Sequence, residues 1–215
     1  MAAYSRSSSA TRSVSIPSTL WALGADPLDP HDRWPAPLLS RTVDEFSAPG
    51  SRVLLIGWPA PTSRGILRML EPDTAAALAA IGEADRHGID APTPSTGIAE
   101  PVDLVVASLL ADHDDPAQAA EHVTALATET MALGGLLVVL SRCRHSPSGV
   151  LLDPAGSVVA AAQAADLLYL QHIIAAPVSG HTVIAAPPAD PAAPGHSRHL
   201  VAHTDVFVFL QPEHG

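Results

Sequence analysis

The sequence contains no lysine and no asparagine, and all 11 of its basic residues are arginine. It has 22 acidic residues, which give a formal net charge of −11. A protein that grips nucleic acid over a broad surface needs Lys and Arg placed against the phosphates. The charge therefore argues against a broad DNA-binding face. It leaves one local basic cluster, formed by Arg142, Arg144 and His145, for any DNA contact.

Cysteine and long apolar runs are also scarce. The single cysteine, Cys143, excludes an internal disulfide and a cysteine-rich metal cluster, which fits a reducing cytoplasm. The longest apolar run, residues 136–140 with its flanks, falls far short of the 18 or more residues of a membrane span. Residues 1–15 carry Arg and Ser but not the apolar segment of a signal peptide. We therefore expect a cytoplasmic protein that does not associate with membranes.

What the chain does have is enough apolar residues for one core. The 215 residues are 47% hydrophobic and only 15% charged, which predicts one folded α/β domain. We expect a disordered tail over residues 1–15, a Pro- and Trp-rich arm over 16–37, and a single domain over 38–212. Trp21 and Trp34 are the predicted anchors of the arm. The arm either contacts a partner or folds over the domain's own sheet, and both interpretations stay open.

Apolar strand-length runs alternate with helical patterns along the domain. The predicted strands are 52–57, 102–108, 136–141, 167–175 and 203–210, and the predicted helices are 37–46, 74–88, 116–133 and 154–165. The glycines at 134 and 135 are expected to stop the third helix, and 89–101 and 177–198 are expected to be loops. Continuous apolar strands are typical of parallel sheets buried on both faces. The predicted fold is a doubly wound, mostly parallel α/β sheet, with the last strand antiparallel beside 167–175.

The C-terminal half carries motifs in a recognisable order: GGLLVVLSRCRH, GVLLDPAGSVVAAAQAADL, YLQHIIAA and HTDVFVFLQP. With the elements before them, they resemble class I S-adenosylmethionine-dependent methyltransferases. Within that superfamily they are most similar to actinobacterial DNA methylases that modify cytosine N4 or adenine N6. The resemblance covers roughly residues 35–212. It implies a Rossmann-like methyltransferase fold, S-adenosylmethionine as cofactor and a DNA base as substrate.

The cofactor turn departs from the family pattern. In active members the first strand runs into a Gly-rich turn, where the backbone approaches the cofactor closely and N–H groups face it. Here Gly57 is the one glycine that remains, and Trp58, Pro59 and Pro61 follow it. A large indole adds bulk, and prolines have no N–H to donate. The resemblance therefore keeps Gly57 as a candidate cofactor contact but predicts a damaged turn.

Two other positions match cofactor contacts of the family. Pro35, in the step Trp34-Pro35, stands where the family has a His-Pro step before the first helix. Glu71 stands where an acid ends the second strand and accepts hydrogen bonds from ribose hydroxyls. The segment from 57 to 71 is short for a strand-turn-helix-strand unit, so either the helix or the second strand is lost. The alternative role for Glu71, or for Asp73, is to cap the helix that follows.

The catalytic motif has also changed. The family has Ser or Asp, two prolines and an aromatic residue after the fourth strand, and these hold the flipped base. The matching positions here begin at Ser108 and continue as Leu109, Leu110 and Ala111. Ser108 is thus the only candidate catalytic residue, and the alternative is a purely structural hydroxyl.

Three further groups of residues suggest chemistry but fit structural roles better. Flanking arginines would lower the pKa of Cys143 and favour a nucleophile, but the resemblance places this residue in a loop with no such role. The acidic run 112–115 precedes Pro116 and fits a helix N-cap better than a metal site. The histidines between 172 and 203 lack a fixed ligand spacing. We expect no metal.

These changes lead to one leading hypothesis and two alternatives. The leading hypothesis is a DNA-methyltransferase-like domain with eroded motifs that binds or regulates a protein partner, or self-associates, and takes no cofactor. The first alternative is an active methylase that uses S-adenosylmethionine through a rearranged site. The second is a structural subunit of a larger assembly.

Overall fold

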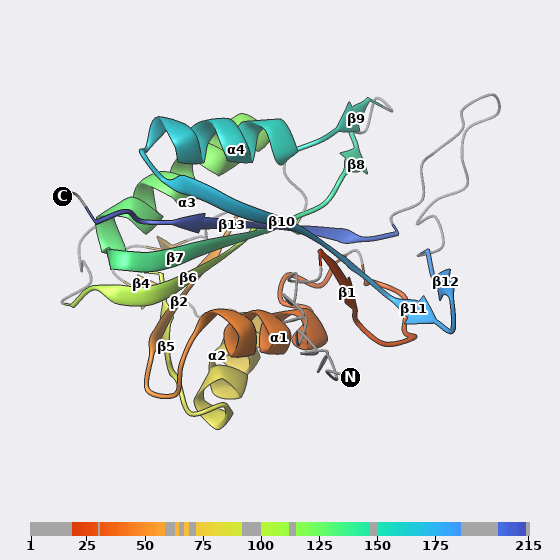
Figure 1. The fold of residues 1–215 in the computed structure, drawn as a ribbon, viewed down its shortest axis with the longest axis horizontal. Helices are drawn as coiled ribbons and strands as arrows, with labels where there is room; N and C mark the ends of the chain where they lie inside the picture. Colours follow the sequence, from red (N-terminus) through yellow and green to blue (C-terminus); the bar gives the residue numbers. More distant parts are fainter. Residues whose placement is uncertain are drawn as a thin grey trace, which may run out of the picture.

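The computed structural model describes residues 19–29, 31–58, 63–64, 67–68, 72–91, 100–111, 115–146, 150–185 and 202–213. They form three layers, with a seven-stranded sheet between two pairs of helices (Figure 1). The strands follow one another across the sheet as β1 (Leu20–Ala22), β10 (Leu168–Ala176), β13 (Thr204–Leu210), β7 (Met131–Ser141), β6 (Val102–Ser108), β2 (Arg52–Gly57) and β5 (His87–Asp90). The helices are α1 (Ala36–Phe46), α2 (Pro72–Glu83), α3 (Pro116–Thr130) and α4 (Ala155–Ala164).

The strand directions confirm the predicted fold class. The three apolar runs form the adjacent parallel strands β2, β6 and β7, and β5 and β1 add parallel pairs at the two edges. β13 runs antiparallel to both of its neighbours, β10 and β7. The sheet is therefore doubly wound and mostly parallel, with one reversed C-terminal strand. Three small two-stranded sheets accompany it: β3 (Ser63–Arg64) with β4 (Leu67–Arg68), β8 (Arg144–His145) with β9 (Leu151–Leu152), and β11 (Val178–Ser179) with β12 (Thr182–Val183).

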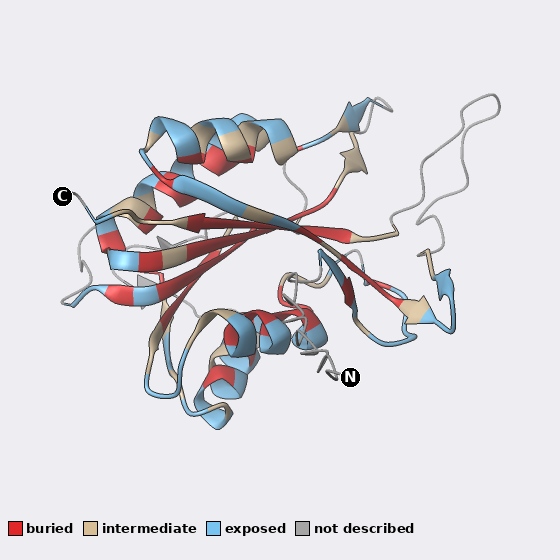
Figure 2. Ribbon diagram, viewed as in Figure 1, coloured by how far each residue is buried: buried red, intermediate tan, exposed pale blue. Residues whose placement is uncertain are grey.

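Burial explains why the central strands read as unbroken apolar runs. Residues 53–56 of β2 and 104–107 of β6 are buried, because helices cover both faces of the sheet (Figure 2). One core lies under α3 and α4 and includes Leu54 and Phe209. The other lies under α1 and α2 and includes Leu55 and Leu38.

The predicted helix over 74–88 is too long. α2 ends at Glu83, the chain turns through Asp85 with φ at 61°, and residues 87–90 form β5 against β2. The loop predicted for 89–101 therefore starts too early. Gly88 does not cap the helix; it lies in β5, where an added Cβ would come within 3.2 Å of the Leu78 carbonyl oxygen. This close approach of α2 to the strand, rather than a helix end, is what the glycine permits.

Gly134 and Gly135 do not stop α3 either. The helix ends at Thr130, and β7 begins at Met131, opposite Val102. The next pair joins Leu104 to Leu136, so residues 132–135 bulge out of the ladder, with Gly134 at a φ of 77°. The predicted loop over 177–198 is also partly wrong, because the β11–β12 hairpin occupies its first residues.

The N-terminal arm joins the sheet. β1 lies within the arm and pairs with Ile174–Ala176 of β10. Trp21 and Trp34 are 2% and 5% exposed, so both predicted anchors are buried in this chain's own core. The predicted tail over 1–15 lies outside the described residues. None of the helices in the described part of the chain is long and apolar enough to cross a membrane.

Candidate active site at the carboxyl ends of the strands

Two of the predicted site residues meet where the parallel strands end. Gly57 ends β2, Ser108 ends β6, and the two are paired across the ladder. Ligands of open α/β sheets bind in the crevice outside the carboxyl ends of the strands. This edge is therefore where a cofactor and a substrate would be expected.

The N-terminal arm crosses this edge and is bonded to it. The Ser108 hydroxyl donates a hydrogen bond of 2.7 Å to the carbonyl oxygen of Arg33. Arg142, which follows β7, donates to the carbonyl oxygens of Asp29 at 3.1 Å and Leu110 at 2.9 Å. Both Ser108 and Arg142 are buried. These bonds hold Asp29 and Arg33 of the arm at the ends of β6 and β7.

The space beside Gly57 is taken by the arm as well. A Cβ added at Gly57 would lie 3.1 Å from both Cδ and Nη1 of Arg33. The Arg33 side chain thus packs against the backbone position that the family keeps clear for its cofactor. The next residue, Trp58, stays beside β6, because its N–H donates to the Ser108 carbonyl at 3.0 Å, and its indole lies 4.9 Å from the His122 ring.

Pro35 is buried and starts α1. Its carbonyl oxygen accepts hydrogen bonds of 2.9 Å from the N–H groups of Leu38 and Leu39. The neighbouring Trp34 indole donates to the Thr74 hydroxyl at 3.1 Å and so ties the start of α1 to the start of α2. The contacts of Trp34 and Pro35 are therefore those of a junction between α1 and α2.

Glu71 lies outside the described residues, so its predicted ribose contact stays a prediction. The premise that it ends the second strand of the main sheet is wrong. β3 and β4, which precede it, form a separate sheet, and the strand beside β2 comes after α2. That strand, β5, ends at Asp90 opposite Leu55. Asp90 is thus the acid at the strand end next to β2, and the short segment HGID gave no recognisable strand pattern.

The remaining predicted groups occupy structural positions. Asp115 caps α3 as expected, accepting hydrogen bonds of 3.0 Å from the N–H groups of Ala117 and Gln118. Burial raises the pKa of the Cys143 thiol to about 11, with Asp153 and Asp205 adding to the effect. This is the opposite of the shift that a cysteine nucleophile needs.

The histidine and acidic groups contain no metal site within the described residues. Asp205 lies 2.8 Å from Nε2 of His172 and 3.5 Å from Nε2 of His203. In the described ranges, no three His, Cys, Asp or Glu side chains are arranged to hold a metal ion. Residues 112–114, the rest of the acidic run, fall outside those ranges.

Arg33 and Arg142 are the site residues that sequence reasoning missed. Arg142 belongs to the basic cluster considered for DNA, but the structure buries it at 4% exposure. Its guanidinium holds the arm rather than facing a phosphate. The sequence offered one signal for Arg142, a charged side chain directly after an apolar strand, and none for Arg33.

S-adenosylmethionine, which the resemblance implies, would meet groups at this edge that already contact one another. A cofactor beside Gly57 would contact the Arg33 side chain. The Trp58 N–H is already bonded to the Ser108 carbonyl, and the Ser108 hydroxyl is bonded to the arm. A cofactor would have to displace these groups to reach the ends of β2 and β6.

No protein-family model and no curated protein matches the chain. Among solved structures, the N-methyltransferase NodS from Bradyrhizobium japonicum with S-adenosyl-l-homocysteine is 17% identical over 82% of this chain and 85% of its own, with a TM-score of 0.43. A TehB-like SAM-dependent methyltransferase from Corynebacterium glutamicum is 12% identical over 80% and 86%, with a TM-score of 0.38. A SAM-dependent methyltransferase from Methanosarcina mazei is 7% identical over 80% of this chain and 97% of its own, with a TM-score of 0.43. Likenesses this weak carry no argument about activity.

Proposed function

We propose that this chain is a methyltransferase-like domain without catalytic activity, which acts by binding a protein partner. In this proposal its own arm covers the edge of the sheet where S-adenosylmethionine would bind. The observation that carries it is the Arg33 side chain against Gly57, 3.1 Å from where a Cβ would stand. An enzyme needs this space for its cofactor, whereas a binding protein can fill it.

The catalytic position supports the same proposal. A methylase needs polar groups free to accept hydrogen bonds from the target amino group, and an aromatic residue to stack on the base. Ser108 is buried and bonded to Arg33, and Leu109 and Leu110 after it are buried and apolar. Descent from the amino-methylating DNA methylases is part of the proposal. It is supported by the family order of β7, α4, β10 and β13 and their motifs.

One observation favours the alternative of an active methylase. Asp90 ends β5, beside β2, and an acid near that position can accept hydrogen bonds from ribose hydroxyls. Under this alternative the arm would have to leave the strand ends before the cofactor enters. The proposal requires instead that the arm stay in place when the cofactor is offered.

Thermal unfolding with and without S-adenosylhomocysteine tests the proposal. A ligand at 100 times its dissociation constant stabilises a protein by about 2.7 kcal/mol, which is about 5–10 °C for a domain of this size. At about 1 mM ligand we expect a shift below about 2 °C. A shift of 5 °C or more, at roughly this concentration, would establish a cofactor site and overturn the proposal.

A further inference from the structure

The two edges of the main sheet differ in how they are protected. One edge is β5, which is only four residues long and ends in the acidic Asp90. Short edge strands and charged side chains keep an exposed edge from pairing with another chain. The opposite edge is formed by β10 and, along part of its length, by the three residues of β1. The nine residues of β10 include no Asp, Glu, Lys, Arg or Pro, so this edge lacks such protection.

β1 covers only the second half of β10. It pairs with residues 174–176, and the Ile174 N–H donates to the Thr19 carbonyl at 2.8 Å, just before β1 begins. On this side, no strand in the described part of the chain pairs with residues 168–172, the open half of β10. Alternate N–H groups of a strand point to the same side, so His172, like Ile174, directs its N–H to this edge. The open half can therefore accept another strand, as the second half accepts β1.

The open half also exposes large apolar side chains. Leu168, Tyr169 and Leu170 are 51%, 41% and 53% exposed, and Figure 2 shows the start of β10 as an exposed stretch. A β-bulge lies here, because Tyr169 pairs with Phe209 and the next pair is Gln171 with Val208, which leaves Leu170 without a partner on β13. Bulges at other edges discourage pairing. This one places an exposed leucine, rather than a charged residue, at the extra position.

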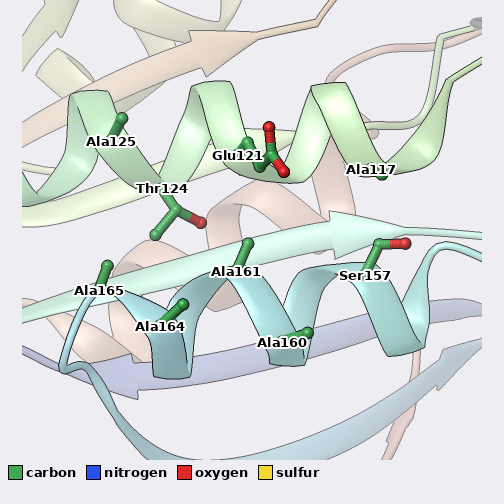
Figure 3. Close-up of a pocket in the computed structure, with 9 residues that line it drawn as sticks. All are labelled: Ala117, Glu121, Thr124, Ala125, Ser157, Ala160, Ala161, Ala164 and Ala165. Atoms are coloured by element: carbon green, nitrogen blue, oxygen red, sulfur yellow. The ribbon is translucent and has the colours of Figure 1, made fainter.

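The groove between α3 and α4 offers a partner less than this edge does (Figure 3). It measures about 490 Å³, and its lining consists mostly of alanines, with Glu121 as the one charged side chain. No large apolar side chain is among its lining residues. The open half of β10 provides both exposed apolar side chains and backbone groups that can form a ladder.

We propose that the open half of β10 pairs antiparallel with the open half of a second copy of this chain, which joins the two sheets into one. A symmetric dimer uses the same patch on both subunits. The open half is centred on Leu170, so Leu170 faces Leu170 of the second copy, and Leu168 faces the second copy's His172. This stretch has no carboxylate, so two chains of net charge −11 meet here without like charges directly opposite each other. An uncharged, self-complementary strand favours a second copy over a partner recognised by its charge.

This inference rests on the proposed function, because it names a second copy as the protein partner. Sedimentation velocity of the full-length protein at increasing concentration should show a species of twice the mass of one chain. Leu170→Lys and Leu170→Glu each place like charges opposite each other at the centre of the interface. Each variant alone should therefore associate at least about tenfold more weakly than the wild type. A mixture of the two variants should associate again, because opposite charges then face each other.

Val150→Lys is the matched control. Val150 is 59% exposed and lies beside β9, outside the open half, so the variant should form the dimer as the wild type does. Circular dichroism checks that each variant is folded. Amide hydrogen exchange distinguishes a ladder from loose apolar contact: the His172 N–H should exchange at least about tenfold more slowly in the dimer than in Leu170→Lys.

Four results would overturn the inference: a monomeric wild type at every concentration, equal weakening by Val150→Lys, no association in the mixture of the two Leu170 variants, or unchanged exchange at His172. The first and last of these do not depend on how well any variant at the edge folds, because concentration alone can separate the monomer from the dimer. A monomeric wild type leaves the cofactor test of the proposed function unaffected. Equally, a thermal shift with S-adenosylhomocysteine would overturn that function and leave the sedimentation result as it is.

Discussion

The two ends of the sheet are built in different ways. At the carboxyl end, buried Ser108 and Arg142 reach residues of the arm that lie 75 and 113 positions away in the sequence. At the amino end, Arg52 forms an ion pair with Glu100, whose side chain is 77% exposed. Among the described residues, Ser108 and Arg142 at the carboxyl end are thus buried against the arm, whereas the ion pair at the amino end lies at the surface. The arm therefore contributes to the fold at the place where a cofactor would compete with it.

The largest effect should come from the aromatic anchor of the arm. Trp21 is buried, its ring stacks on Phe46 at 5.9 Å, and the Arg41 guanidinium lies 4.8 Å from its centre. Trp21→Ala should lower the free energy of unfolding by about 3–5 kcal/mol, or roughly 10 °C in melting temperature. An unchanged melting temperature with loss of a partner or of self-association would show that Trp21 serves an interface instead.

Arg142→Met should have the next largest effect. The substitution keeps much of the side chain's length but removes both hydrogen bonds, leaving the carbonyl oxygens of Asp29 and Leu110 without this donor. We expect a loss of about 2–3 kcal/mol and faster limited proteolysis between residues 19 and 35. Uniformly faster proteolysis along the chain, without preference for the arm, would contradict the role of Arg142 as its clamp.

Ser108→Ala should cost less, about 1 kcal/mol, because one neutral hydrogen bond to the Arg33 carbonyl is lost. Urea unfolding can resolve a change of this size as a lower midpoint concentration of urea, with the slope of the unfolding free energy against urea unchanged. A variant as stable as the wild type would mean that the arm does not depend on this bond.

The smallest effect belongs to the amino end of the sheet. Glu100→Gln removes an exposed ion pair with Arg52 and should change stability by less than about 0.5 kcal/mol. The same urea measurement provides the comparison with Ser108→Ala. If Glu100→Gln were the more damaging of the two, the contrast between the two ends of the sheet would be wrong.

The sheet could be predicted because its strands are buried on both faces. Val53–Ile56 and residues 104–107 had to be apolar without interruption, and that pattern is visible in the sequence. β5 was missed because its four residues, HGID, begin just after the turn that ends α2, and none of them is fully buried. Segments this short carry too few apolar positions to show a period.

The candidate site was harder to predict than the sheet. The sequence showed that the residues at Gly57 and Ser108 depart from the pattern of the family that it resembles. The contacts that fill this edge were not, because Arg33 and Arg142 act through single side chains on carbonyl oxygens or on a glycine far away in the sequence. Such contacts follow from the tertiary path of the arm, and no local pattern encodes them.

In the proposed function, the arm rather than S-adenosylmethionine occupies the ends of β2 and β6. A calorimetric titration of the full chain with S-adenosylhomocysteine tests it most directly. If the arm stays in place, we expect no binding tighter than about 1 mM, equivalent to only about −4 kcal/mol. A micromolar dissociation constant would contradict it, because the cofactor would then displace Arg33 from Gly57 at little cost.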